Sequence, residues 1–306
     1  MRIFITGATG FLGAHTLNAV QDAGHDVAAL IRPETDPWRI RARLDDITAV
    51  PGSLDDPSSF FRVFNNFKPD AVVNVAWGGV GNTVHDDPAQ ATNLPALEAF
   101  LQLAADTGVE HWIGLGSQAE YGPKDHPIGE DARPQPVTAY GRAKLAASAL
   151  TEDFCARYGI RSAWLRLFSC YGPMDKESWL IPSLTIKLLN GEAPSLTEGR
   201  QRMDYLYATD AADAIRAVLE CPAAAGIFNL GSGSAVPVRD IATRIRDLIA
   251  PKTALGFGEI PQRAGAQMLM QADISKLTSA TGWKPKTSLN DGLAATVDWF
   301  RTNQTA

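Results

Sequence analysis

Hydrophobic and polar residues alternate through the first half of the chain in blocks of two lengths. The short blocks are apolar and of strand length, at Arg2–Thr6, Val27–Ile31, Ala71–Ala76, Trp112–Leu115 and Ser162–Leu167. The longer blocks have helical periodicity, at Phe11–Ala23, Asn93–Asp106 and Thr138–Tyr158. Strands that alternate with helices of this length predict crossover connections and a parallel sheet covered by helices on both faces.

The alternation becomes irregular after Tyr171. Residues 172–203 are rich in loop-forming types and contain one predicted helix at Ile181–Leu189, before a helix at Thr209–Cys221 and a strand at Ile227–Leu230. We therefore predict an α/β fold with a doubly wound parallel sheet over residues 1–170, to which a segment at about 204–230 returns. Residues 171–203 and 231–306 are predicted to form a smaller C-terminal α/β domain.

Composition and net charge limit the partners and the cellular location that we expect for this protein. The 306 residues are 45% hydrophobic and 20% charged, as in ordinary globular proteins, and the net charge of -6 disfavours nucleic acid or an anionic membrane as a partner. The chain shows neither a signal peptide at its start nor an apolar run of about 20 residues. Its three cysteines lack metal-ligand spacing, so we expect reduced thiols, a cytoplasmic location and no metal.

A glycine-rich turn, Thr6–Gly13, follows the first strand directly and opens the first helix. In such a turn one glycine allows the tight bend, one lets the backbone approach a pyrophosphate, and one lets helix and strand pack closely. The helix start then presents free N–H groups and a partial positive charge to the anion. The turn therefore predicts a dinucleotide site on a Rossmann-type sheet.

The end of the second strand bears on the choice of dinucleotide. An acidic residue there binds the ribose 2′-hydroxyl of NAD, whereas an arginine nearby accommodates the 2′-phosphate of NADP. The strand ends with Ile31 at the acidic position and Arg32 next to it, and Asp36 lies too far into the loop. These residues favour NADP(H), and NAD(H) stays possible.

Tyr140 and Lys144 stand four residues apart on a predicted helix, so both side chains lie on one face. A phenol has an ordinary pKa of about 10, so it is a weak acid–base catalyst near neutral pH unless a nearby ammonium group stabilises its anion. The hydroxyl group of Ser117 can bond the same substrate oxygen. The three residues predict proton transfer to or from an alcohol or ketone.

These segments together resemble the extended short-chain dehydrogenase/reductases, the NAD-dependent epimerase/dehydratase family. The Gly-x-x-Gly-x-x-Gly spacing, Ser117 with Tyr140 and Lys144, the segment 165–173 and the Gly-Trp-Lys-Pro turn at 282–285 extend the likeness over nearly the whole chain. The resemblance implies that Tyr140 donates or accepts the proton, that Lys144 also contacts the nicotinamide ribose, and that Ser117 orients the substrate oxygen. It places the cofactor contacts at Gly7, Thr9, Gly10, Phe11, Leu12, Gly13, Arg32, Ser53, Leu54, Val75, Ala76, Trp77, Asn93, Tyr140, Lys144, Leu167 and Ser169.

Members of this family act mostly on nucleotide-diphosphate sugars, and the resemblance implies such a partner, bound by the C-terminal domain. It places the substrate contacts at Trp77, Ser117, Gln118, Ala119, Ser169, Arg202 and Arg263. One departure from the family pattern weakens the expected diphosphate-binding site, because Met203 stands where the family has an arginine before Asp204. Arg202 is the available substitute. A homodimer formed through long helices, Thr138–Tyr158 among them, is a further family expectation.

The residues after Ser117 bear on the reaction. The family's sugar dehydratases carry an Asp-Glu pair there, and an amide and a methyl group, from Gln118 and Ala119, cannot replace it in proton transfer. Likeness to the 4-keto-6-deoxyhexose 4-reductases leads us to expect NADPH-dependent reduction of a 4-keto sugar nucleotide. The alternatives are an NAD-dependent 4-epimerase and, less favoured, a non-catalytic cofactor sensor. We expect His85 and His126 to lie in solvent.

Overall fold

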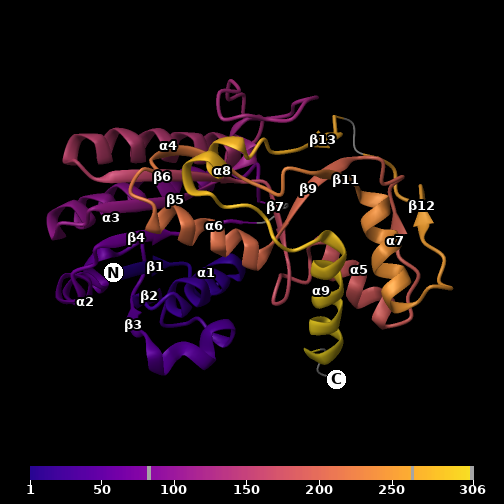
Figure 1. Cartoon of the computed structure of the whole chain (residues 1–306), viewed down its shortest axis with the longest axis horizontal. Coiled ribbons are helices and arrows are strands. Elements are labelled where there is room, and N and C mark those ends of the chain that lie inside the picture. Colours follow the sequence, from indigo (N-terminus) through magenta and orange to yellow (C-terminus); the bar gives the residue numbers. More distant parts are fainter. Residues whose placement is uncertain (81–83, 263–264, 304–306) are drawn as a thin grey trace.

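The computed structural model describes residues 1–80, 84–262 and 265–303, and its centre is a seven-stranded parallel sheet (Figure 1). The strand order is β10-β6-β5-β4-β1-β2-β3, and neighbouring strands pair in parallel. The strands span β1 (Arg2–Thr6), β2 (Asp26–Ile31), β3 (Thr48–Pro51), β4 (Ala71–Asn74), β5 (His111–Ser117), β6 (Arg161–Leu167) and β10 (Gly226–Leu230). The prediction of a Rossmann-type α/β fold is confirmed.

Helices cover both faces of this sheet because its inner strands bury side chains on both sides. One face packs against α1 (Phe11–Asp22), α6 (Ala208–Glu220) and α8 (Ser275–Thr281). The other packs against α2 (Phe61–Phe67), α3 (Asn93–Thr107) and α4 (Ala139–Tyr158). The predicted long helices begin and end within two residues of those observed. Within the residues that the structure describes, no helix is long and apolar enough to cross a membrane.

The segment between β2 and β4 contains elements that the hydrophobic pattern does not reveal. A 3-10 helix, η1 (Trp38–Asp46), buries only Ile40, and the edge strand β3 buries only Val50. Such short, mostly polar stretches carry no clear period of 2 or 3.6, so periodicity cannot separate them from a loop. Pairing with β2 makes β3 a strand.

The C-terminal part of the chain builds a second, smaller layer beside the carboxyl ends of the main strands, at the right of Figure 1. Its sheet contains β7 (Ser169–Tyr171), β9 (Arg202–Tyr207), β11 (Ala235–Pro237) and β13 (Leu269–Met270), and β8 (Ser195–Leu196) pairs separately with β12 (Gly256–Phe257). Three helices share an apolar core with this sheet: α5 (Leu180–Leu189), α7 (Val238–Ile249) and α9 (Leu289–Asn303).

The buried carboxylate of Asp204 on β9 holds the small sheet to the chain that leaves β10. It accepts hydrogen bonds from the backbone N–H groups of Ser232, Gly233 and Ala272, at 2.6 to 3.0 Å. The Ser232 hydroxyl adds a fourth bond at 2.6 Å. Because a buried carboxylate is costly unless its oxygens are bonded, these four donors explain how Asp204 is accommodated.

Candidate active site

The end of β5 and the start of α4 bring the three predicted catalytic side chains together. Ser117 is the last residue of β5, and Tyr140 and Lys144 lie on the buried face of α4. The Thr138 side chain caps α4 by accepting the N–H of Gly141 at 3.0 Å. A side chain at Gly141 would overlap the Ala119 carbonyl, so glycine lets the helix approach the turn after β5. The Ser117 hydroxyl group lies close enough to Tyr140 to affect the acidity of its phenol.

Burial dominates the acidity of Tyr140, whose side chain is 9% exposed. It raises the pKa of the phenol to about 12, the nearby Ser117 hydroxyl group lowers it in part, and the negative charge of Glu120 raises it further. The phenol therefore carries its proton at neutral pH in this environment.

Lys144 lies in an enclosed setting of aromatic rings and one carbonyl group. Its Nζ donates to the Leu115 carbonyl at 2.8 Å and lies 3.8 Å from the ring centroid of Trp77 and 5.9 Å from that of Trp164. Burial lowers the pKa of Lys144 to about 7, and the negative charge of Glu120 acts in the opposite direction. Whether Lys144 carries its extra proton near neutral pH therefore depends on the groups around it.

Trp77 follows β4 and forms a wall of this site. Its ring meets that of Tyr140 edge-on, with centroids 6.3 Å apart, and its indole N–H donates to Gln90 at 2.8 Å. The Asn93 amide closes the same turn by accepting the N–H of Gly78 at 2.7 Å and donating to its carbonyl at 3.2 Å. The structure thus places Trp77 and Asn93 at the site, while their cofactor and substrate roles stay predictions.

His85 lies differently from our expectation. Its ring stacks on that of Tyr140, with centroids 4.7 Å apart and planes 10° apart, and its carbonyl accepts the Tyr140 N–H at 2.8 Å. Burial lowers the pKa of this imidazole. The expectation of a solvated side chain is therefore wrong for His85, because α4 packs onto its loop. It agrees with the structure for His126, which is 62% exposed.

The glycine turn fits a pyrophosphate group. Gly7 has a φ of +73°, and a Cβ there would lie 2.8 Å from the Ala76 backbone nitrogen. A Cβ at Gly13 would overlap the Gly7 carbonyl, and one at Gly10 would lie 3.1 Å from the same oxygen. The backbone of α1 therefore packs tightly against β1 and β4 with its first N–H groups free of side-chain caps, the arrangement that receives an anion. Thr9, Phe11 and Leu12 belong to the same turn and helix start.

The end of β2 is more exposed to solvent than the glycine turn. Arg32 is 65% exposed, and its Nε lies 3.6 Å from Glu34, which is itself 70% exposed. Ser53 and Leu54 follow the neighbouring strand β3, and the Ser53 N–H donates to Ser59 at 3.1 Å. These residues form the edge of the sheet at which we predict the adenosine half of the cofactor.

Sequence reasoning missed a charged cluster beside the glycine turn. Arg39 on η1 donates to the Met174 carbonyl at 3.0 Å and to that of Thr9 at 3.4 Å. Nearby Asp175 is 7% exposed; burial raises the pKa of its carboxyl group to about 7, against the lowering effects of a backbone bond and of Arg39. No local sequence pattern predicts this contact, because η1 and the segment around Met174 are far apart in the sequence.

The remaining predicted substrate and cofactor residues occupy several settings. Gln118 and Ala119 belong to η4 (Gln118–Glu120), directly after Ser117, and Leu167 pairs in register with Ser117. Ser169 begins β7 on the following segment. Val75 and Ala76 follow β4 beside the glycine turn, with the Ala76 N–H bonded to Thr6 at 3.2 Å.

The two predicted arginine contacts differ in what the structure shows. The Arg202 side chain donates to the Ala235 carbonyl at 2.8 Å, which ties β9 to β11. Met203 packs against the apolar cluster around Tyr121 and Phe168. Arg263 lies outside the described residues. The diphosphate contacts therefore stay predictions.

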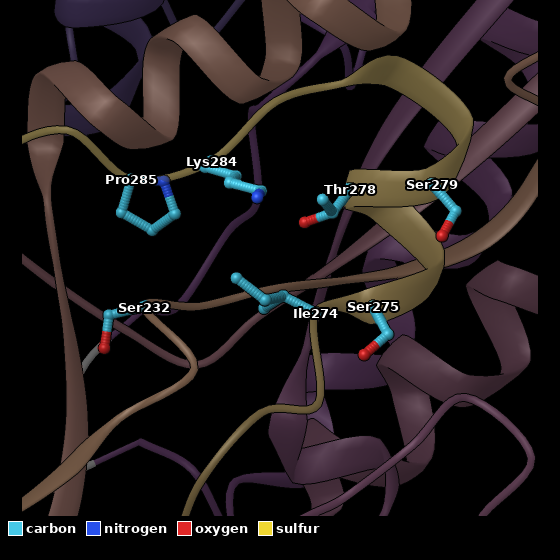
Figure 2. Close-up of a pocket in the computed structure, with 7 residues that line it drawn as sticks. All are labelled: Ser232, Ile274, Ser275, Thr278, Ser279, Lys284 and Pro285. Atoms are coloured by element: carbon cyan, nitrogen blue, oxygen red, sulfur yellow. The ribbon is translucent and has the colours of Figure 1, made fainter.

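A separate open hollow lies between the turn after β10 and α8, where the side chains of Lys284 and Thr278 point toward each other (Figure 2). Its lining is Ser232, Ile274, Ser275, Thr278, Ser279, Lys284 and Pro285. None of these is a predicted catalytic or cofactor residue.

Comparison with known proteins identifies the family. The model of the NAD dependent epimerase/dehydratase family matches residues 3–231, so the chain belongs to this family and the predicted resemblance is confirmed. The UDP-glucose 4-epimerase of Azospirillum brasilense is 27% identical, over 98% of this chain and 92% of that protein.

Solved structures agree with this assignment. The UDP-glucose 4-epimerase of Thermotoga maritima, solved with UDP-glucose, has a TM-score of 0.91 and 25% identity, with 100% of both chains covered. The protein MoeE5, solved with UDP-glucuronic acid and NAD, has a TM-score of 0.86 and 26% identity, with 99% of each chain covered.

Proposed function

We propose that this member of the NAD-dependent epimerase/dehydratase family is a nucleotide-sugar 4-epimerase that works through a transient 4-ketone with bound NAD. The observation that carries the proposal is the enclosed group of Ser117, Tyr140 and Lys144 on a chain that matches 4-epimerases over nearly its full length. This proposal revises our expectation of a ketoreductase, since the relatives named above support the epimerase alternative better.

The side chains support reversible proton transfer at the sugar 4-oxygen. A bound nicotinamide supplies reversible hydride transfer at carbon 4. Tyr140 takes the proton of the 4-hydroxyl group during oxidation and returns it during reduction, while Ser117 donates a hydrogen bond to the same oxygen. Lys144 favours the phenolate through its positive charge. Gln118 and Ala119 offer no carboxyl group for removal of water, so dehydration is not part of the proposal.

The glycine turn fits the pyrophosphate group of the cofactor. The smaller C-terminal part of the chain is where we propose that the sugar nucleotide binds. We propose that residues 171–203 and 231–306 form the substrate-binding part, which lies beside the carboxyl ends of the main strands. Ser169 and Leu167 would line the passage between the two parts. Arg202 and Arg263 would bind the diphosphate, because a guanidinium fork suits phosphate oxygens.

Two observations favour a second candidate, an NADPH-dependent 4-ketoreductase. Ile31 leaves no acid for the ribose 2′-hydroxyl, and Arg32 stands beside it. The protonated phenol of Tyr140 is also the form that donates a proton to a ketone. A reductase consumes its cofactor, whereas an epimerase regenerates it within each turnover.

One experiment on the purified protein, carried out without added cofactor, separates the two candidates. Purified protein is denatured in acid and the released dinucleotide is identified, while intact protein receives UDP-glucose or its dTDP, CDP and GDP counterparts with no added cofactor. We expect about one NAD per chain and a 4-epimer among the products. NADPH oxidation that depends on a 4-keto sugar nucleotide, with no bound NAD, would establish the reductase instead. Absence of both activities contradicts both candidates.

We also propose a homodimer formed through α3 and α4. Tyr158, at the end of α4, is 47% exposed and stacks on the buried ring of Phe154 with ring centroids 4.5 Å apart, so one aromatic side chain of this helix faces outward. Light scattering after gel filtration should give twice the chain mass of 32.9 kDa. A monomer at micromolar concentration would contradict this.

A further inference from the structure

A buried ion pair lies directly beneath the predicted catalytic serine. Glu120, the last residue of η4, is 0% exposed, and its Oε2 accepts from the Nε of Arg166 on β6 at 2.6 Å. Arg166 is 2% exposed, and its guanidinium group lies 4.4 Å from the ring centroid of Tyr121. Both charged groups are therefore removed from water, and each lies against its counter-ion inside the protein.

The other carboxylate oxygen of Glu120 holds the backbone of the site. Oε1 accepts the N–H of Ser117 at 2.8 Å and the indole N–H of Trp164 at 3.0 Å. The Ser117 hydroxyl oxygen in turn accepts the N–H of Ala119 at 3.2 Å, which completes a reciprocal capping box around η4. The position of the serine hydroxyl thus depends on a carboxylate three residues later.

The neighbouring strand makes room for this arrangement. A side chain at Gly114 or Gly116 on β5 would overlap the Trp164 indole, and one at Gly116 would also crowd Glu120. Glycine in a strand interior is unfavourable by roughly 0.5 to 1 kcal/mol relative to alanine, and often marks a close approach. Two glycines in a central strand therefore permit the indole to reach the carboxylate.

Stability alone does not explain a buried ion pair here. Apolar side chains of similar volume commonly stabilise a core as well as, or better than, a buried ion pair. The titratable groups that face the site come from three directions: Glu120 after β5, Arg166 on β6, and the imidazole of His85 from the loop. Among these, Glu120 raises the pKa of both Lys144 and Tyr140. The pair is therefore placed to act on the reacting groups.

We propose that Glu120 is a positioning residue of this site, which holds Ser117 in place and supplies the buried negative charge that favours the ammonium form of Lys144. Arg166 and Trp164 keep that carboxylate oriented. This inference rests on the proposed function for its catalytic consequence, while the charge effect is a property of the chain itself.

Glu120→Gln keeps an amide oxygen for Ser117 and Trp164 but removes the charge. We expect kcat to fall by 10- to 100-fold, with KM and bound cofactor changed less than about twofold. The whole pH profile of kcat should move to lower pH by about one unit, because the lost charge had raised the pKa of both Tyr140 and Lys144. A role in folding alone would leave the profile in place.

Glu130→Gln is the matched control, since that half-buried carboxylate also accepts a backbone N–H, from Asn229 at 2.7 Å. It should leave the pH profile unchanged. If Glu120→Gln does not fold, the neutral double variant Glu120→Gln/Arg166→Met removes both buried charges. We expect that variant to fold with lowered kcat. An unchanged kcat in a folded Glu120 variant would overturn the proposal.

A measurement independent of turnover separates this inference from the proposed function. Lysine-selective NMR follows the titration of Lys144 in the purified protein, and Glu120→Gln should move it to lower pH. If the shift occurs while the wild type converts no sugar nucleotide, the charge effect stands and the proposed function fails. If the wild type is active and the titration does not move, the inference fails.

Discussion

The carboxyl ends of β5 and β2 belong to one sheet but differ in how far they are enclosed. At β5, Ser117, Tyr140 and Lys144 are 9%, 9% and 3% exposed, and each side chain is held by hydrogen bonds or by contacts with aromatic rings. At β2, Arg32 is 65% exposed and faces an equally exposed Glu34. The candidate acid–base residues thus lie in an enclosed place, and the residues that we predict to select the cofactor lie in an exposed one.

The difference has a physical reason. Shifts in pKa and preorganised hydrogen bonds require groups removed from water, where charges act strongly on one another. An exposed guanidinium group is screened by solvent and gains little until a phosphate lies against it. Changes at β5 should therefore affect turnover strongly, and changes at β2 should affect cofactor preference mildly.

The largest effect is expected from Tyr140→Phe, which removes the only proton that this ring can transfer. Turnover should fall by about 1,000-fold, while bound cofactor and Tm stay close to those of the wild type. Product formation is followed by chromatography. Tyr158→Phe, on the exposed end of the same helix, should leave turnover unchanged. Full activity of Tyr140→Phe would refute its role as acid and base.

Gly7→Ala tests whether crowding at the glycine turn weakens cofactor binding. The positive φ costs about 1 to 2 kcal/mol, and the new Cβ would also press on the Ala76 backbone. We expect bound dinucleotide to fall at least tenfold, with a lowered Tm. Gly24→Ala has a similar φ of +81° but no atom within 4 Å of the added Cβ. If both variants bind equally well, crowding at the turn is not what shapes the cofactor site.

Arg32→Ala tests the open end. If the reductase candidate holds, the Kd of NADPH should rise about tenfold, or about 1.4 kcal/mol, with the Kd of NADH unchanged. Arg41→Ala is the control, since Arg41 is 68% exposed and pairs with Asp36. Under the epimerase proposal we expect no difference between the two variants. A loss of NADH binding in Arg32→Ala would contradict both assignments of this side chain.

Asp175→Asn should have the smallest effect on turnover and cofactor binding, because its expected effect is on stability. Burial raises the pKa of this carboxyl group to about 7, so its protonated form favours the folded state in acid and that contribution is lost as the pH rises through about 7. The variant should therefore gain more stability at pH 8 than at pH 5, by about 2 kcal/mol. Thermal unfolding at both pH values measures this. Exposed Asp153→Asn should show no such difference.

Periodicity predicted most of the fold because the central strands and long helices have strong, continuous apolar patterns. It missed η1 and β3, where a single buried residue each, Ile40 and Val50, anchors a mostly polar stretch. It also missed the small strands β8, β12 and β13, which contain two residues each. Such elements become strands only through partners that are distant in the chain.

The site was predictable where its residues are close in sequence or follow a recognisable turn. Spacing placed Tyr140 and Lys144 on one helix face, and the glycines marked the phosphate turn. Local pattern did not indicate that His85 would stack on Tyr140. It also gave Glu120 no role, because its partner Arg166 lies on the next strand of the sheet.

The sequence by itself determined the family and the alternating α/β order and predicted the candidate acid–base residues, because each depends on local spacing and on residue type. Tertiary structure decided the electrostatics. Only folding brings Glu120 against Arg166 beneath Ser117, and only burial moves the pKa of Tyr140 to about 12 and that of Lys144 to about 7. Desolvation depends on what surrounds a group in space, and that information is not contained in any short stretch of chain.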